Sequence, residues 1–172
     1  GDVREAARSA IDNAPPTAYF SVIQFNETSL TIEDFTNDHN RIKSAIDIVE
    51  SVPNNGTCLY DAVYDAIGLL DDQIQSPQER RAIILFTDGK DQITGDTLCS
   101  RHSFNDVINA ARPANSSAPI TPIHTIGLFD AQGGNLNEAE LRRMASETIA
   151  YSAIGNQTNL GGLFQEIMDG LN

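Results

Sequence analysis

The sequence predicts an α/β fold with a doubly wound, mostly parallel sheet and helices on both faces. Segments with apolar residues at helical spacing alternate along the chain with short apolar segments typical of strands. The run Ala82–Phe86 does not alternate polar with apolar residues, as expected for a strand covered on both faces in a parallel sheet. The 172 residues contain no internal repeat, low-complexity segment or linker. We therefore expect a single domain over residues 1–172.

Four elements are expected in the first fifty residues. Apolar residues at helical spacing predict a helix over Val3–Ile11, which ends before a Pro-Pro pair. A short polar turn then joins a strand at Ala18–Phe25 to an edge strand at Ser29–Phe35, whose apolar residues alternate. Asp38 is a suitable N-cap for the next helix, which carries apolar residues through Val49.

Seven further elements complete the predicted fold. The clearest helical pattern of the chain follows Thr57, where apolar residues recur from Leu59 to Leu70. Asn137, with Glu140 three residues later, has the spacing of a capping box at the start of another helix. The remaining elements are expected at Ala82–Thr87 (strand), Phe104–Ala111 (helix), Pro119–Phe129 (strand), Asn137–Met144 (helix), Ile149–Ile154 (strand) and Leu160–Leu171 (helix).

The acidic composition restricts the classes of partner. Lys and Arg total 11 against 24 Asp and Glu, which gives a formal net charge of −13. Nucleic-acid binding requires a basic face for phosphate contacts, and the only lysines are Lys43 and Lys90, so no nucleic-acid partner is expected. No apolar run approaches the roughly 18 residues of a membrane span, so no direct membrane insertion is expected either. A leader or an anchor could belong to a larger multidomain parent chain.

The two cysteines leave two interpretations open. Cys58 and Cys99 are too few for a zinc site and lack its spacing. If they are bonded, they close a loop of 41 positions, and the chain-entropy model gives a stabilisation of about 4 kcal/mol. A disulfide would also indicate an oxidising compartment. The alternative is a pair of free thiols, with Cys58 buried.

Two short strings predict a site for a hard divalent cation, Mg²⁺ or Mn²⁺. Thr57 precedes the clearest helix, and Asp88 follows the buried strand at the carboxyl edge of the sheet, where ligands bind in open α/β sheets. Hydroxyl and carboxylate oxygens are the ligands that such ions accept. The structural alternatives are a helix N-cap for Thr57 and a turn-forming carboxylate for Asp88. Three nearby carboxylates could border the site: Asp91, Asp96 and Asp130.

These motifs, taken together and in order, resemble the von Willebrand factor type A domain, a Rossmann-like module of integrins, matrix proteins and many bacterial surface proteins. The resemblance rests on Gly56-Thr57-x-Leu59-x-Asp61-Ala62, Thr87-Asp88-Gly89, Ile123-His124-Thr125-Ile126-Gly127, and the helical pairs Glu140-Leu141 and Leu163-Phe164. The family's metal-ion-dependent adhesion site combines an Asp-x-Ser-x-Ser loop with a threonine and a later aspartate. The resemblance implies that Thr57 and Asp88 are the last two of these ligands.

The Asp-x-Ser-x-Ser loop does not occur in these 172 residues. In the family this loop follows the first strand, which lies in the centre of the sheet between the strands that correspond to Ala18–Phe25 and Ala82–Thr87. We therefore expect this strand to be absent from the chain and supplied by sequence outside it or by another chain. Direct hydrogen bonding between the two flanking strands would contradict this expectation.

The resemblance implies a non-enzymatic adhesion module that presents the cation to an acidic side chain of a protein partner. Two other functions stay open: a structural or assembly domain with an incomplete metal site, and a metal-assisted phosphohydrolase that uses Asp88. The resemblance favours an extracellular or cell-surface location, although some members of the family are cytoplasmic.

Overall fold

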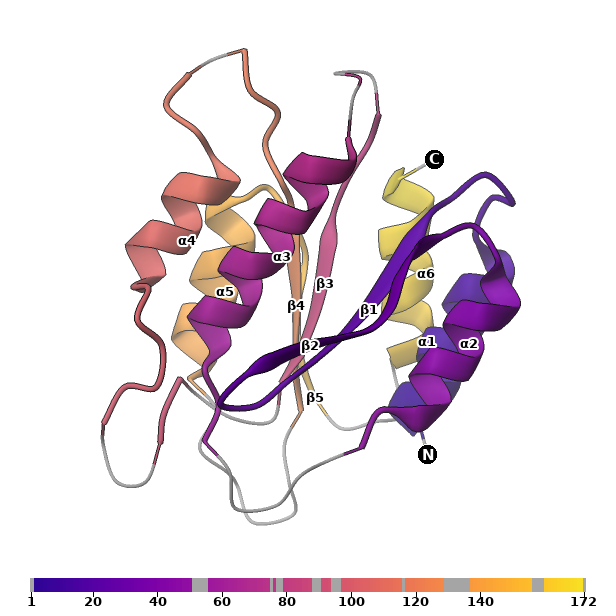
Figure 1. Cartoon of the computed structure of the whole chain (residues 1–172), viewed down its shortest axis with the longest axis horizontal. Coiled ribbons are helices and arrows are strands. Elements are labelled where there is room, and N and C mark those ends of the chain that lie inside the picture. Colours follow the sequence, from indigo (N-terminus) through magenta and orange to yellow (C-terminus); the bar gives the residue numbers. More distant parts are fainter. Residues whose placement is uncertain are drawn as a thin grey trace.

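The structure is a computed structural model that describes residues 2–50, 56–74, 76, 79–87, 91–93, 97–115, 117–128, 137–155 and 160–171. Every helix and strand expected from the sequence is present, and the predicted α/β class is confirmed (Figure 1). The elements are α1 Asp2–Asn13, β1 Phe20–Phe25, β2 Ser29–Thr36, α2 His39–Ile48, α3 Leu59–Gln73, β3 Ile83–Thr87, α4 Phe104–Ala111, β4 Ile123–Leu128, α5 Glu138–Glu147, β5 Ser152–Gly155 and α6 Leu160–Leu171.

The described strands form two separate sheets. Strands β3, β4 and β5 make a parallel sheet in the order β3-β4-β5, with Ile83 opposite Ile123 and Thr125 opposite Ser152. Strands β1 and β2 make an antiparallel pair, with an irregular register at its open end. Among the described residues no ladder joins β1 to β3. The direct pairing that would have contradicted an absent central strand is therefore not observed.

Helix α3 spans the break between the two sheets, because it contacts β1, β2 and β3 (Figure 1). Its apolar side chains pack with those of α4, α5 and β4 in one core cluster. A second cluster lies on the other face and joins α1 and α6 to β4. The fully buried members of the first cluster include Val63, Ile67, Val107, Ile123, Leu141 and Met144.

Capping follows the sequence at two predicted helix starts. The Asp38 carboxylate accepts hydrogen bonds from the main-chain N–H groups of Asn40 and Arg41, at 3.1 and 3.3 Å. The Asn137 side chain accepts from the N–H of Glu140 at 3.3 Å. Each side chain thus satisfies N–H groups that the first helical turn leaves unpaired.

The predicted strand beginning at Ile149 starts later than expected. Ile149 has a φ of 58° and 71% of its surface is exposed, because it lies in the turn that ends α5. The N–H of Ala150 donates to the carbonyl of Ala145 at 2.9 Å and closes this turn. Strand β5 therefore begins only at Ser152.

His124 is a packed histidine in the core of the parallel sheet. It lies in β4 with 6% of its surface exposed, and its Nδ1 accepts a hydrogen bond from the N–H of Tyr151 at 3.1 Å. Burial lowers the pKa of His124 to about 4. The imidazole is therefore neutral in the folded protein under conditions in which it titrates in the unfolded chain.

We expect the free energy of unfolding to fall as the pH drops from about 6.5 to about 4. In this window the unfolded chain binds a proton at His124 and the folded chain does not, so protonation favours unfolding. The free energy of unfolding, measured by urea titration at several pH values in this range, should change less steeply with pH for His124→Gln, which removes the titrating group. An equal slope in both proteins would contradict the assignment.

Replacing Ile67 in the middle of α3 should test the core. Ile67 is 1% exposed, and Ile67→Ala should lower the free energy of unfolding by about 2–5 kcal/mol through lost burial and a cavity. The neighbouring Gly68 is the matched control, because a Cβ added there meets no atom within 4 Å. Gly68→Ala should be neutral or stabilise by up to ~1 kcal/mol in urea unfolding, and an equal loss in both variants would contradict this account.

Candidate functional site

The Thr57 segment lies between the end of β1 and the residues that follow β3. The N–H of Thr57 donates to the carbonyl of Gln92 at 2.8 Å, and the N–H of Gln92 returns a bond to the carbonyl of Thr57 at 3.0 Å. On the other side, the N–H of Cys58 donates to the carbonyl of Asn26 at 2.7 Å, at the tip of the β1–β2 hairpin. The segment is thus fixed through its main chain.

Thr57 is not the N-cap of α3. That position belongs to Cys58, whose side chain makes no capping hydrogen bond. The structural alternative for Thr57, a helix N-cap, is therefore wrong. Within the described ranges the Thr57 hydroxyl makes no hydrogen bond, while its main chain is paired with Gln92.

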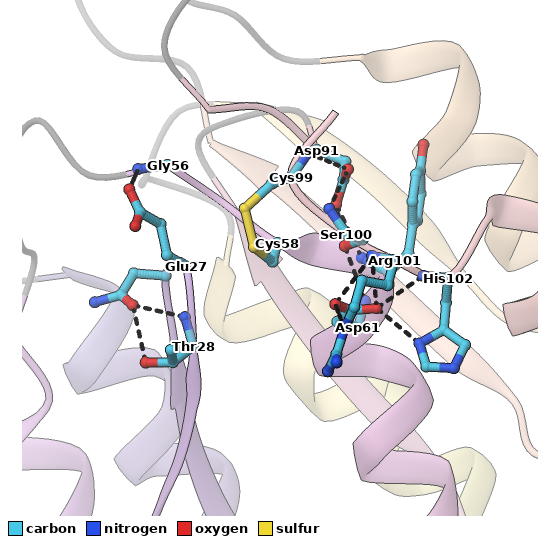
Figure 2. Close-up of a disulfide and its surroundings, with 12 residues drawn as sticks. Glu27, Thr28, Gly56, Cys58, Asp61, Asp91, Cys99, Ser100, Arg101 and His102 are labelled. Atoms are coloured by element: carbon cyan, nitrogen blue, oxygen red, sulfur yellow. Dashed lines mark hydrogen bonds and ion pairs between the residues drawn. A yellow bond between two sulfur atoms is a disulfide. The ribbon is translucent and has the colours of Figure 1, made fainter. Parts of the chain in front are cut away.

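Gly56 is required by the close approach of two chain segments. A Cβ at this position would lie 2.6 Å from Cγ2 of Ile93 and 2.9 Å from the carbonyl oxygen of Gln92. The N–H of Gly56 donates to the Glu27 carboxylate at 3.0 Å, and Figure 2 shows this side chain reaching up from the hairpin. A larger residue at Gly56 would displace the pairing that positions Thr57.

Asp88, the second predicted ligand, lies outside the described residues, as do Asp96 and Asp130. Strand β3 ends at Thr87, immediately before Asp88. Its parallel ladder with β4 continues through Thr87, which lies opposite Gly127. The expected position of Asp88 at the carboxyl end of a parallel strand stays a prediction.

The two cysteines are bonded. Cys58 and Cys99 form a disulfide that connects the start of α3 to the segment before α4 (Figure 2). The alternative of two free thiols is therefore wrong. The bond closes a loop of 41 positions, for which the chain-entropy model gives about 4 kcal/mol.

Asp91 is a buried carboxylate that organises the segment around Cys99. Its side chain accepts hydrogen bonds from the N–H groups of Tyr60, Cys99 and Ser100, at 3.3, 3.1 and 3.0 Å, and from the Ser100 hydroxyl. Only 4% of its surface is exposed. Asp91 is thus occupied by protein donors, which argues against the border role that the sequence left open for it.

Asp61, near the start of α3, is a second carboxylate that binds main-chain donors. It accepts from the N–H groups of Arg101 and His102, and it lies 2.7 Å from Nδ1 of His102 (Figure 2). Burial alone would raise the pKa of Asp61, but the N–H donors of His102 and Arg101 outweigh it and hold the pKa below 3.8. The His102 ring stacks on Tyr64 with 3.8 Å between centroids.

Tyr60 is a core residue and does not line a contact surface. It is 5% exposed, and its hydroxyl donates to the Glu140 carboxylate at 2.5 Å. Burial and this hydrogen bond raise the pKa of Tyr60. The bond connects the start of α3 to the first turn of α5.

The described residues contain no group of three or more His, Cys, Asp or Glu side chains arranged to hold a metal ion. Asp88 is not among the described residues. Of the two predicted ligands, the structure thus positions Thr57 alone, with a hydroxyl oxygen of the type that a hard cation accepts.

Comparison with protein families decides the classification. Residues 1–90, which include the Thr57 segment and the end of β3, match the model of the von Willebrand factor type A domain. The chain belongs to this family. A search among curated proteins gives no significant match to this type A domain.

Solved structures share the fold. A von Willebrand factor type A protein from Catenulispora acidiphila has a TM-score of 0.72 and 20% identity over 97% of the chain, and the chain spans 37% of that protein. The von Willebrand factor domain of the type V pilus tip protein Mfa5 from Porphyromonas gingivalis has a TM-score of 0.66 and 14% sequence identity. This match covers 98% of the present chain and 85% of the Mfa5 chain. The PilB minor pilin from Streptococcus sanguinis has a TM-score of 0.64 and 14% sequence identity. This match covers 98% of the present chain and 53% of the PilB chain.

Replacing Asp91 should destabilise this type A domain. Asp91→Asn presents an amide N–H₂ to main-chain N–H groups, so it should lower the free energy of unfolding by about 1–3 kcal/mol in urea titrations. The exposed Asp65 on α3 is the control, and Asp65→Asn should change stability by less than about 0.5 kcal/mol. Equal losses of unfolding free energy in Asp91→Asn and Asp65→Asn would show that the hydrogen bonds accepted by Asp91 do not stabilise the fold.

Proposed function

We propose that this type A domain is a non-enzymatic protein-binding module whose binding surface is the edge that carries Thr57. The cation is Mg²⁺ or Mn²⁺, held by the Thr57 hydroxyl and the Asp88 carboxylate. An acidic side chain of the partner protein completes the coordination. Two protein ligands with one negative charge leave the ion electrophilic enough to attract a carboxylate.

This proposal rests on the fact that Thr57 uses its main chain, and not its hydroxyl, in the hydrogen bonds that hold it. Its main chain is held by two hydrogen bonds to Gln92, and its hydroxyl has no partner within the described ranges. A hydroxyl presented from a fixed main chain can bind an ion without the entropic cost of ordering a loop. The disulfide next to it restricts the same segment further.

A cell-surface setting supports this function. The Cys58–Cys99 disulfide is typical of oxidising compartments. Two relatives of the same fold are a pilus tip protein and a minor pilin, which are surface proteins. No helix in the described ranges is long and apolar enough to cross a membrane. We propose that the domain is displayed outside the cell within a larger chain.

Thermal unfolding in chelator and in millimolar Mg²⁺ or Mn²⁺ should reveal the cation. At a concentration 100 times its dissociation constant the ion should stabilise the fold by about 2.7 kcal/mol and raise the Tm. The shift should disappear in Thr57→Val and in Asp88→Ala, which remove the two oxygen ligands while Thr57→Val keeps the shape of the side chain.

The control for this measurement is Thr28→Val, which removes a hydroxyl whose hydrogen bond among the described residues goes to Asn26 in the same turn. It should keep the full cation-dependent shift. An equal shift in wild type and in both ligand variants would contradict the proposed ligands. Binding of an acidic protein partner that survives excess chelator would contradict the metal-dependent mechanism.

A further inference from the structure

Strand β2 is the open edge of the antiparallel β1–β2 pair. The N–H of Asn26 donates to the carbonyl of Thr28 at 3.0 Å, so Leu30, two residues beyond Thr28, also exchanges main-chain hydrogen bonds with β1. The alternation of a strand then directs the N–H and C=O groups of Ser29 and Thr31 away from β1. No other strand in the described part of the chain pairs with β2 on that side.

This part of the edge lacks the features by which folded proteins protect exposed strands. Ser29, Leu30 and Thr31 are all exposed and include neither a charged residue nor a proline. The irregular register of the pair and the charged residues Glu33 and Asp34 lie beyond Thr31. A regular, uncharged edge of this kind pairs readily with an extended segment of another chain.

An open groove of about 430 Å³ lies between this edge and α3, which contacts both β1 and β2 (Figure 1). Its strand wall consists of Ile23, Ser29 and Thr31. The side chain of Leu30, which is 61% exposed, lies on the opposite face of the pair. A strand added to β2 would therefore place alternate side chains over the groove and the others beside Leu30.

Helix α3 forms the other wall of the groove and makes it acidic. This wall consists of Tyr64, Asp65, Gly68, Leu69 and Asp72. The ion pairs that α3 makes within the described ranges use Asp61 and Asp71, so Asp65 and Asp72 are carboxylates without an ion-pair partner there. None of the residues that line the groove is basic. Its charge thus favours Lys or Arg side chains of a partner.

Gly68 leaves the groove open. It lies at an interior position of α3, where glycine is less favourable than alanine. A Cβ added there meets no atom within 4 Å, so packing inside the domain does not require a glycine. What the missing side chain provides is room in the groove for side chains of a bound segment.

We propose that the β2 edge and this groove dock an extended, basic segment of a partner protein. The segment pairs with the outward main-chain groups of β2 as a third strand. Its Lys or Arg side chains reach Asp65 and Asp72, and the β-branched apolar residues that alternate with them pack beside Leu30. A second copy of this chain is a poor occupant, because each copy has a net charge of −13. This contact is separate from the proposed cation site and needs no cation.

Titration of the chain with a defined peptide in excess chelator tests this docking site. The probe is a capped Lys-Val-Lys-Val-Lys-Val-Lys peptide. It should bind and slow hydrogen exchange of the Ser29 and Thr31 amides by ~10-fold or more, while the amide of Leu30, already bonded to β1, changes little. The same peptide with glutamate in place of lysine should not bind, because its charge matches that of the groove.

Two N-methylated versions of the lysine peptide separate strand pairing from charge attraction. One carries methyl groups on the amide nitrogens of its lysines, and the other on those of its valines. Successive N–H groups of a strand point to opposite sides, so only one of the two sets can face β2. The two peptides should therefore differ in affinity by at least ~10-fold, because one loses several main-chain hydrogen bonds.

Variants of the protein locate the contact. Asp65→Asn combined with Asp72→Asn should weaken binding of the lysine peptide by ~5-fold or more, and Gly68→Gln, which fills the groove, should also weaken it. Glu5→Gln combined with Glu166→Gln removes two exposed carboxylates of α1 and α6 and should change the affinity by less than ~2-fold.

Four results would overturn the proposal. These are no binding of the lysine peptide, equal affinity of the two N-methylated peptides, equal weakening by the two pairs of charge substitutions, and unchanged affinity in Gly68→Gln. Because every titration contains chelator, none of these results depends on the proposed cation.

Discussion

The hydrogen bonds between the main chains of Thr57 and Gln92 help connect the β1–β2 hairpin to the β3–β4–β5 sheet, two regions that no described strand ladder joins. Strands β1 and β2 form one sheet and β3, β4 and β5 form another. The segment at Gly56–Cys58 is bonded to the hairpin through Asn26 and Glu27 and to the region after β3 through Gln92. It therefore sets the relative position of the two sheets at one edge, and α3, which begins directly after it, extends this connection across the break.

The interactions around this segment differ in size. A main-chain hydrogen bond contributes about 1 kcal/mol net, so the two Thr57–Gln92 bonds together contribute on the order of 2 kcal/mol. The Cys58–Cys99 disulfide contributes about 4 kcal/mol in the chain-entropy model. The disulfide thus gives the larger share of stability, while the hydrogen bonds determine which way the Thr57 hydroxyl is presented. Asp91 contributes mainly by accepting from three main-chain N–H groups, of which that of Tyr60 is buried and those of Cys99 and Ser100 are partly buried.

The sequence predicts the elements of this fold well because their signals are local. Apolar spacing identifies α3, and the uninterrupted run at residues 82–86 identifies β3. Asp38 and Asn137 cap helices where expected, because capping depends on a few neighbouring residues. Ile149 lies in a turn and not in the predicted strand, since an apolar side chain does not reveal a left-handed backbone.

The site is less predictable because its contacts join distant segments. Nothing near Gln92 indicates that it pairs with Thr57, and the buried role of Asp91 depends on donors from Tyr60, Cys99 and Ser100. The absence of the Asp-x-Ser-x-Ser motif does, however, predict a divided sheet, which agrees with the described ladders.

The hydrogen bonds between Thr57 and Gln92 hold the Thr57 segment in place without a bound ion. Amide hydrogen exchange of Thr57 and Gln92 in the presence of chelator tests it most directly. We expect protection similar to that of Leu85 in β3, because both N–H groups are bonded across the Thr57–Gln92 pair. Exchange of both amides at the rate of an exposed loop would show that the segment is not ordered without an ion, and would contradict the account.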